Sequence, residues 1–409
     1  MLRRRMLRSP AQLAAIWITS LLVGIGVFWL TCLVEPASRA TLNFGTEYAQ
    51  MAVDPFALLG KFPHRLLAPL IAHELGLGGD RYWLFAHGCT VLLIAMIFAA
   101  ATLLGARWWQ ALLLTTAIAF TGTVQLYKGH VGYPDPITWL LMTATIVARR
   151  HPRTFWTLQF LNVMHHEQIL FFWPWLLWWR HREDWRQGKA WLPDAFGAAV
   201  VLGIYVLWRS HVGAHAAQQM LTLEHYESLK YFPVGTLGLT ALNLLSTFIW
   251  FGALPVLVAW HAFVDGWKRE GWGILLFLVS LHAVFGVAHD VYRFSCFLFV
   301  PVLFAGLRLC RERYGAWLLA GLTLVSVFLI RWQAPVFERI GTAVLVEMTP
   351  NGPAVRSEPV MSIVPEVIPA NAGTFLAYGL VLVATILVGW LWARASRHQQ
   401  ERPTSTGIS

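Results

Sequence analysis

Residues 154–179 read TFWTLQFLNVMHHEQILFFWPWLLWW, two largely apolar runs separated by HHEQ at 165–168. At 1.5 Å per residue, neither run can cross a hydrocarbon core of roughly 30 Å. Short helices with polar ends are stable at membrane depth only where those ends are buried in protein or line a water-filled cavity. The stretch therefore predicts an all-α integral membrane protein that contains half-length helices around a polar cavity.

The rest of the chain has the same apolar character. Of its 409 residues, 57% are hydrophobic and 13% are charged, whereas a soluble domain has about 25% charged residues. The apolar runs are continuous rather than alternating, which excludes a barrel. We expect one polytopic membrane domain (1–395), followed by a disordered tail (396–409). About twelve transmembrane or half-length helices are predicted, at 13–34, 82–105, 108–126, 136–148, 154–165, 168–179, 195–210, 236–260, 272–288, 294–308, 314–330 and 373–393.

The charges predict the orientation of these segments. With the N-terminus inside, 20 of the 31 Lys and Arg residues fall in short inside loops and tails, while 14 of the 21 acidic residues fall outside. This is the positive-inside bias of a multi-pass protein. It indicates that both termini are cytoplasmic. The basic residues are split among separate loops, so we expect contact with the lipid bilayer and no nucleic acid, and we interpret the inside charges at 180–184 as a solvated rim.

Three outside segments are long: 35–81, 211–235 and 331–372. The first contains PHRLLAPLIAHELGL (63–77), whose apolar spacing predicts an amphipathic helix on the outer surface. The third carries an Asn-Gly turn signal at 351–352, which predicts a hairpin or small cap over the site. The four cysteines lie in or beside apolar segments without CxxC spacing, and we interpret them as packing residues.

The first outside segment holds two pairs of candidate residues. Glu47 and Asp54 are seven apart, a spacing that returns to one face of a helix, and two such carboxylates can share a base role, a divalent metal ion or a polar substrate. His64 and Arg65 precede LLAPL, and an Arg and a His at a helix start suit a phosphate group. The alternatives are a solvated loop for the carboxylates and headgroup anchoring for Arg65.

The remaining candidates fall at the same predicted outer face. His130 and Asp135 lie in the second outside loop, where Asp135 can alternatively cap the next helix. An ionisable residue at membrane depth indicates function by default, and the HHEQ motif places His165, His166 and Glu167 there. The alternative for HHEQ is that its hydrogen bonds hold the two half-length helices together. Asp290 and Arg293 of HDVYR lie at the outer end of the predicted segment 272–288. Asp290 and Arg293 are three apart and can pair on one helix face, either as a structural ion pair or to hold the arginine toward a phosphate.

In order, these motifs resemble a family of bacterial polytopic membrane proteins that look like GT-C glycosyltransferases. The matching motifs are an acidic first outside loop, HRLLAP (64–69), HHEQILFFWP (165–174) and DVYRFSCFLFVP (290–301). The resemblance implies a GT-C-like fold, an external active site and a polyprenyl-phosphate sugar donor. It implies that Asp54, or Glu47, is the catalytic carboxylate and that His64, Arg65 and Arg293 hold the lipid phosphate.

The resemblance favours a glycosyltransferase that moves a sugar from a polyprenyl-phosphate donor to a cell-envelope acceptor at the periplasmic face. Many members of the family carry an Asp-x-Asp pair in the first loop, and Glu47 and Asp54 depart from that spacing. A transporter or flippase of a polar or lipid-linked solute is an alternative, because twelve spans also suit a transporter. A metal- or haem-binding protein that uses the histidines is a third.

Overall fold

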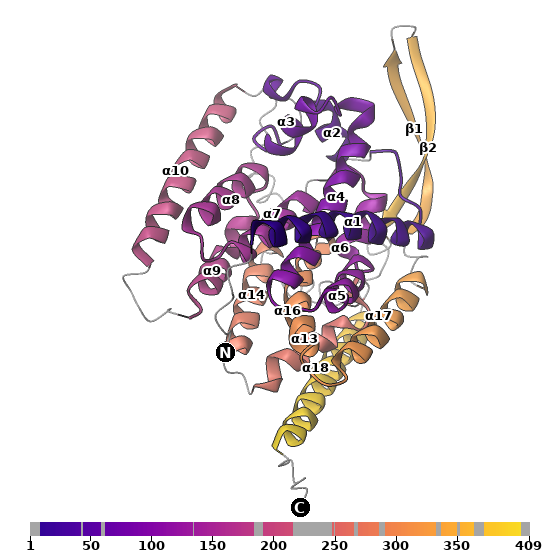
Figure 1. Cartoon of the computed structure of the whole chain (residues 1–409). Helices are drawn as coiled ribbons and strands as arrows, with labels where there is room; N and C mark the ends of the chain where they lie inside the picture. The colour runs from indigo at the N-terminus through magenta and orange to yellow at the C-terminus, as the bar shows by residue number, and fades with distance from the viewer. Residues whose placement is uncertain are drawn as a thin grey trace, which may run out of the picture.

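The computed structural model describes residues 9–41, 44–58, 62–133, 135–183, 191–215, 248, 250–265, 269–285, 291–332, 337–349, 352–363 and 372–401. The described chain is mainly helical, as expected (Figure 1). The α-helices are α1 (Pro10–Val34), α2 (Phe44–Met51), α3 (Leu67–Glu74), α4 (Tyr82–Leu103), α5 (Trp108–Ala119), α6 (Gly122–Gly129), α7 (Asp135–Val147), α8 (Pro152–His165), α9 (Ile169–His181), α10 (Leu192–His215), α13 (Leu254–Val264), α14 (Arg269–Phe285), α15 (Val291–Ser295), α16 (Phe299–Leu309), α17 (Gly315–Trp332) and α18 (Ala372–Glu401).

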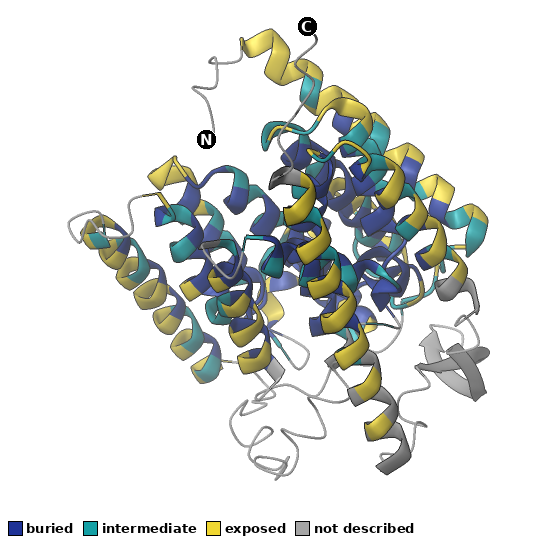
Figure 2. Ribbon diagram, turned by 90° about the horizontal axis from the view of Figure 1, so that it is seen from below, coloured by how far each residue is buried: buried dark blue, intermediate teal, exposed yellow. Residues whose placement is uncertain are grey.

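Among the described residues, three helical stretches are long and apolar enough to cross a membrane: Pro10–Val34, Gly79–Leu103 and Leu192–His215. In the apolar windows of α1 and α10 only 17% and 11% of residues are buried, so both helices lie at the periphery. Their outward faces carry large apolar side chains such as Leu22 and Leu207, 65% and 71% exposed. Figure 2 shows exposed residues along the outer helices and buried ones in the centre. Apolar surface of this extent suits lipid better than water.

The HHEQ motif divides two helices at the expected place. α8 ends at His165, and His166 is extended, with φ −156° and ψ 115°, before α9 begins at Ile169. The predicted segment 108–126 is also divided, because Thr121 leaves the helical conformation and its hydroxyl accepts a hydrogen bond from the Thr123 amide at the start of α6. Of the predicted segment 236–260, only residues 248 and 250–260 are described.

The first outside segment departs from two expectations. α2 ends at Met51, and Asp54 caps the short 3-10 helix Pro55–Ala57, so Glu47 and Asp54 are not on one helix face. α3 begins at Leu67, so His64 and Arg65 precede the helix rather than opening it. Pro55 fixes the first break, since its ring removes the amide that a continuing helix needs.

Near the C-terminus the predicted hairpin is present, whereas the last helix is longer than expected. The chain after α17 forms an antiparallel hairpin, β1 (Phe337–Thr349) and β2 (Gly352–Ile363), with Thr349 opposite Gly352 (Figure 1). Its role as a cap stays a prediction. α18 runs to Glu401, so the first residues of the predicted disordered tail are helical, and residues 402–409 lie outside the described part.

The charges at the far ends of α8 and α9 are not the solvated rim that we expected. Asp194 at the start of α10 is 1% exposed and accepts hydrogen bonds from Arg180 Nε (2.7 Å), Trp156 Nε1 (2.8 Å) and His181. Arg149 donates to Glu183 at 2.7 Å. These pairs hold the neighbouring ends of α7, α8, α9 and α10 together. A buried charge is stable only when it is paired, so the pairs are expected to persist.

Candidate functional site

A buried ion pair joins the first outside segment to the break between α8 and α9. Arg65 binds the Glu167 carboxylate with two parallel hydrogen bonds, Nη2 to Oε1 at 2.6 Å and Nε to Oε2 at 3.0 Å. His64 Nε2 lies 3.3 Å from the same Oε2, and Arg65 Nη1 donates to the Tyr48 hydroxyl at 3.2 Å. His64 and Arg65 are 4% and 5% exposed, while the Glu167 side chain is 21% exposed. Glu167 therefore lies at the open edge of the cluster.

The electrostatics of this cluster follow from its burial. Burial alone would raise the pKa of Glu167, but the charge of Arg65 and the hydrogen bond from His64 hold that pKa well below its usual value. Burial lowers the pKa of His64, and the nearby Glu167 only partly opposes this. At neutral pH the cluster is thus a carboxylate, a guanidinium and a neutral imidazole. A carboxylate held in this way is a poor proton acceptor.

The second arginine of the site is paired to a residue far away in sequence. Asp135, the first residue of α7, is 0% exposed. Its Oδ2 accepts a hydrogen bond from Arg293 Nε at 2.9 Å and forms an ion pair with Arg293 Nη2 at 2.8 Å. Arg293 lies on α15. We predicted that Asp135 would bind substrate or cap its helix, and that Arg293 would pair with Asp290. The structure gives Arg293 the partner Asp135, and Asp290 lies outside the described residues.

A row of aromatic rings joins the two arginines. The Arg65 guanidinium lies 4.0 Å from the Phe62 ring centroid, and that of Arg293 lies 4.5 Å from the Tyr133 centroid. The Phe44 ring packs edge-on against both, with centroids 5.4 Å from Phe62 and 5.8 Å from Tyr133. Cations over aromatic faces are stabilised by the ring quadrupole. The two guanidinium groups therefore flank one continuous aromatic surface.

Two glycines allow the first and second outside loops to meet at this row. A Cβ on Gly45 would lie 2.0 Å from the Val131 carbonyl oxygen, and one on Gly132 would lie 2.8 Å from the Gly45 Cα. Gly132 also has φ +95°, a backbone angle that residues with a Cβ rarely adopt. Thr41 pairs with Val131 beside this contact. The close approach places Phe44 against Tyr133.

His166 directly precedes Glu167 in the chain, with its Nδ1 3.9 Å from Glu167 Oε2, and is 0% exposed. Its Nδ1 accepts the Gln168 backbone amide at 3.4 Å, which assigns the proton of the neutral ring to Nε2. Nε2 is buried and has no hydrogen-bond partner among the described residues. Burial holds the pKa of His166 well below its usual value, and the charges of Arg65 and Arg293 lower it further. The site thus contains a buried hydrogen-bond donor, the Nε2–H of His166, whose imidazole is kept neutral by burial and by the charges of both arginines.

The other candidates occupy less central positions. His165 is fully buried, and its ring lies edge-on to His166 with centroids 6.5 Å apart. His130 ends α6 and packs edge-on against Tyr133. Glu47 is half-buried on α2, one residue before Tyr48, whereas Asp54 is exposed. The structure therefore gathers His64, Arg65, Asp135, His166, Glu167 and Arg293 and leaves Asp54 outside this cluster.

Sequence reasoning missed the residues that support the charged ones. Tyr48, Phe44, Phe62 and Tyr133 were not singled out, although Tyr48 directly follows Glu47 in the acidic loop. Trp208 on α10 was also missed, and its Nε1 donates to the His64 carbonyl at 2.9 Å. In apolar sequence such aromatics give no distinct signal. The described residues hold no group of three or more His, Cys, Asp or Glu side chains arranged to bind a metal ion.

No family model, no curated protein and no solved structure matches this chain. The function of the chain is therefore inferred from the residues of the candidate site. Two guanidinium groups oriented by carboxylates, a neutral imidazole whose N–H has no partner among the described residues and a nearby second imidazole form a set of hydrogen-bond donors. Such a set suits an anion with several acceptor oxygens, such as a phosphate ester.

Proposed function

We propose that this chain is a membrane glycosyltransferase that moves a sugar from a polyprenyl-phosphate donor to a cell-envelope acceptor. The observation that carries the proposal is the aromatic row of Phe62, Phe44 and Tyr133, which links the guanidinium groups of Arg65 and Arg293. These arginines come from segments far apart in sequence, and each is oriented by a buried or half-buried carboxylate. A leaving lipid phosphate needs this kind of fixed positive site, because charge develops on its oxygens as the bond to the sugar breaks.

The proposal assigns separate roles to the carboxylates. Glu167 and Asp135 orient the two guanidinium groups and do not take a proton. The acceptor hydroxyl attacks the anomeric carbon, the bond between that carbon and the phosphate oxygen breaks, and the electron pair leaves with the phosphate. A carboxylate of the first outside loop takes the hydroxyl proton. Glu47 and Asp54 are the two candidates, and Glu47 lies on α2 beside Tyr48, which contacts Arg65.

The membrane setting is part of the same proposal. It comprises about twelve spans in a GT-C-like arrangement, both termini cytoplasmic and the site at the periplasmic face of a bacterial inner membrane. Two features support it: the positive-inside bias of the sequence, and the position of Glu167 and Arg182 at opposite ends of α9. The order of motifs, which resembles that of GT-C glycosyltransferases, supports the choice of a lipid-phosphate donor.

The test is transfer in proteoliposomes from radiolabelled polyprenyl-phosphate sugars. Arg65→Lys and Arg293→Lys keep the charge but lose the bidentate hydrogen bonding of the guanidinium group. We expect the KM for the sugar donor to rise about 10- to 100-fold in each. If Glu47 is the general base, Glu47→Gln should lower kcat about 100-fold or more, and if Asp54 is the base, Asp54→Asn should do so. Glu74→Gln and Asp80→Asn change exposed acidic residues nearby and should leave both constants unchanged. No transfer by the parent, or equal transfer by all four site variants, would overturn the proposal.

One observation favours the alternative of a transporter or flippase. A fully buried polar seam follows the interface of α7 and α8 inward from the site. Asn162 Nδ2 donates to the Thr138 carbonyl at 3.1 Å, and Gln159 Nε2 donates to the Thr145 hydroxyl at 2.9 Å. Polar side chains between helices also serve simply as packing contacts in membranes. For a transporter, Asn162→Leu and Gln159→Leu should abolish flux of a lipid-linked sugar across proteoliposomes, whereas a transferase should keep its transfer rate.

A further inference from the structure

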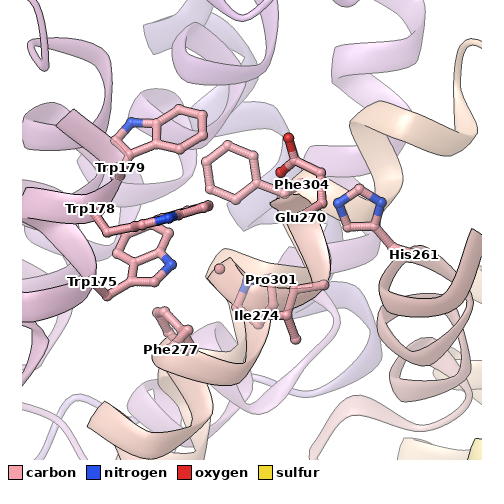
Figure 3. A pocket seen from close by; sticks show the side chains of 10 residues that line it. Trp175, Trp178, Trp179, His261, Glu270, Ile274, Phe277, Pro301 and Phe304 are labelled. Atoms are coloured by element: carbon pink, nitrogen blue, oxygen red, sulfur yellow. The ribbon is translucent and has the colours of Figure 1, made fainter. Parts of the chain in front are cut away.

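A pocket lies at the opposite end of α9 from the candidate site (Figure 3). One wall carries the indoles of Trp175, Trp178 and Trp179 from α9. His261 from α13 and Glu270 from α14 face them, and the rest of the lining comes from α14 and α16: Gly273, Ile274, Phe277, Pro301 and Phe304. In Figure 3 the His261 ring lies across the pocket from the indoles, beside the Glu270 carboxylate. The proposed transfer chemistry uses none of these residues.

The backbone makes room for one of the indoles. A Cβ on Gly273 of α14 would lie 2.1 Å from the outer ring atoms of Trp178. Any larger residue at this position would displace Trp178 from the pocket wall. The indoles of Trp175 and Trp179 are nearly parallel, at 8° with centroids 6.2 Å apart. The aromatic wall is therefore ordered, and α14 approaches it closely because residue 273 is a glycine.

His261 is energetically unfavourable at its buried position. It is 5% exposed, and its Nδ1 is buried without a hydrogen-bond partner in the described part of the chain. A leucine would occupy the same place without leaving a buried polar atom unsatisfied. A purely structural reason therefore does not account for the imidazole.

Charged residues stand one helical turn beyond the pocket. Arg308, one turn after Phe304, pairs with Asp265 at 3.3 Å, and Asp265 is one turn after His261. Arg182, just after the tryptophans, pairs with Glu270 of the pocket lining. Arg182, Arg308 and Arg311 all act electrostatically on His261, and Asp265 acts in the opposite sense. Arg182 is paired with Glu270, and Arg308 is paired with Asp265 and Glu312. The rim beyond the pocket therefore holds three arginines, two of which are oriented by carboxylates.

We propose that this pocket binds one anionic phospholipid of the leaflet on the arginine-rich side. The aromatic wall takes the glycerol and first methylene groups, as indole rings do at the boundary between headgroups and acyl chains. The phosphodiester lies toward His261 and the arginine rim, and basic pockets between helices on the cytoplasmic side are known to hold anionic headgroups. This inference concerns a site separate from the proposed transferase centre.

The test is native mass spectrometry of the protein released from nanodiscs of phosphatidylglycerol and phosphatidylcholine. We expect the parent to retain one phosphatidylglycerol molecule in preference to phosphatidylcholine. His261→Leu should retain it about tenfold less, the loss expected for one hydrogen bond to a charged group. Because it also removes a buried unsatisfied nitrogen, His261→Leu should melt at the same or a higher temperature than the parent. That readout separates lost binding from lost folding.

Gly273→Ala tests the wall independently of charge, since it displaces Trp178 and should also reduce retention. Arg313→Gln is the matched control, because Arg313 follows α16 on the same side but lies over Tyr314 and does not line the pocket. Soluble glycerol phosphate added in excess should not displace the lipid if the acyl region contributes. Equal retention by parent and His261→Leu, or equal retention of the two lipids, would overturn the proposal.

Discussion

Arg65 and Glu167 are 102 residues apart in sequence and meet with Nη2 2.6 Å from Oε1. The pair joins the first outside segment to the α8–α9 break, and it buries the guanidinium almost completely. The same contact therefore closes the fold and orients the positive charge of the candidate site. Stability and binding are expected to respond together when it is changed.

Glu167→Ala should strongly destabilise the protein. It leaves Arg65 buried with only the Tyr48 hydroxyl as a described partner, and an uncompensated buried charge costs about 3–5 kcal/mol. The measurement is the melting temperature in detergent micelles. Glu74→Ala, which removes an exposed carboxylate of the same outside segment, should change it little.

The double variant Arg65→Leu with Glu167→Leu separates stability from function. Replacing both charges by apolar residues removes the buried unpaired charge, so stability should return most of the way to that of the parent. Binding of a polyprenyl-phosphate donor should stay lost. If the double variant melted as low as Glu167→Ala, the pair would be holding the fold together by more than charge compensation.

Acid should destabilise the protein in two stages. Because burial lowers the pKa of His64 and His166 below 6.5, the unfolded chain binds more protons than the folded one, and stability falls as the pH drops below about 6.5. The stabilisation from Glu167, whose pKa is lowered from 4.5, is present above that value and is lost below it. Melting temperatures between pH 8 and about pH 2 measure both stages.

A comparison of two variants identifies the first stage. His166→Phe should flatten the loss of melting temperature between pH 7 and 5. His73→Asn, which changes an exposed histidine on α3, should keep the slope of the parent. An identical slope in all three proteins would mean that His166 is not a source of the acid sensitivity.

The sequence predicted the clustered charges better than their partners. HHEQ between two short apolar runs identified the α8–α9 break, because four polar residues in an apolar region are costly unless a cavity receives them. Local spacing could not predict that Asp135 pairs with Arg293, since the two residues are 158 apart in sequence, and the suggested partner Asp290 lies outside the described residues. Glu47 and Asp54 were placed on one face by assuming a continuous helix, but the chain leaves α2 at Met51, before Pro55.

Gly45→Ala and Gly132→Ala should disturb the contact between the first two outside loops. A Cβ at residue 45 would overlap the Val131 carbonyl oxygen, and one at residue 132 would also require a left-handed backbone. Each should lower the melting temperature and weaken donor binding, because Phe44 and Tyr133 support the arginines. Gly129→Ala is the control, as its Cβ would meet nothing within 4 Å. If Gly45→Ala had the melting temperature and donor binding of the parent, the close contact between the two loops would not be needed for either.

His166→Phe provides the sharpest separation of binding from folding at the candidate site. The Nε2–H of His166 is buried without a partner among the described residues, so its removal should leave stability unchanged or raise it. If that N–H donates to the donor phosphate, the KM for the donor should rise about tenfold, the equivalent of roughly 1.4 kcal/mol. A stable variant with unchanged KM would remove His166 from the site. A variant that melts several degrees lower would instead assign the imidazole a structural role.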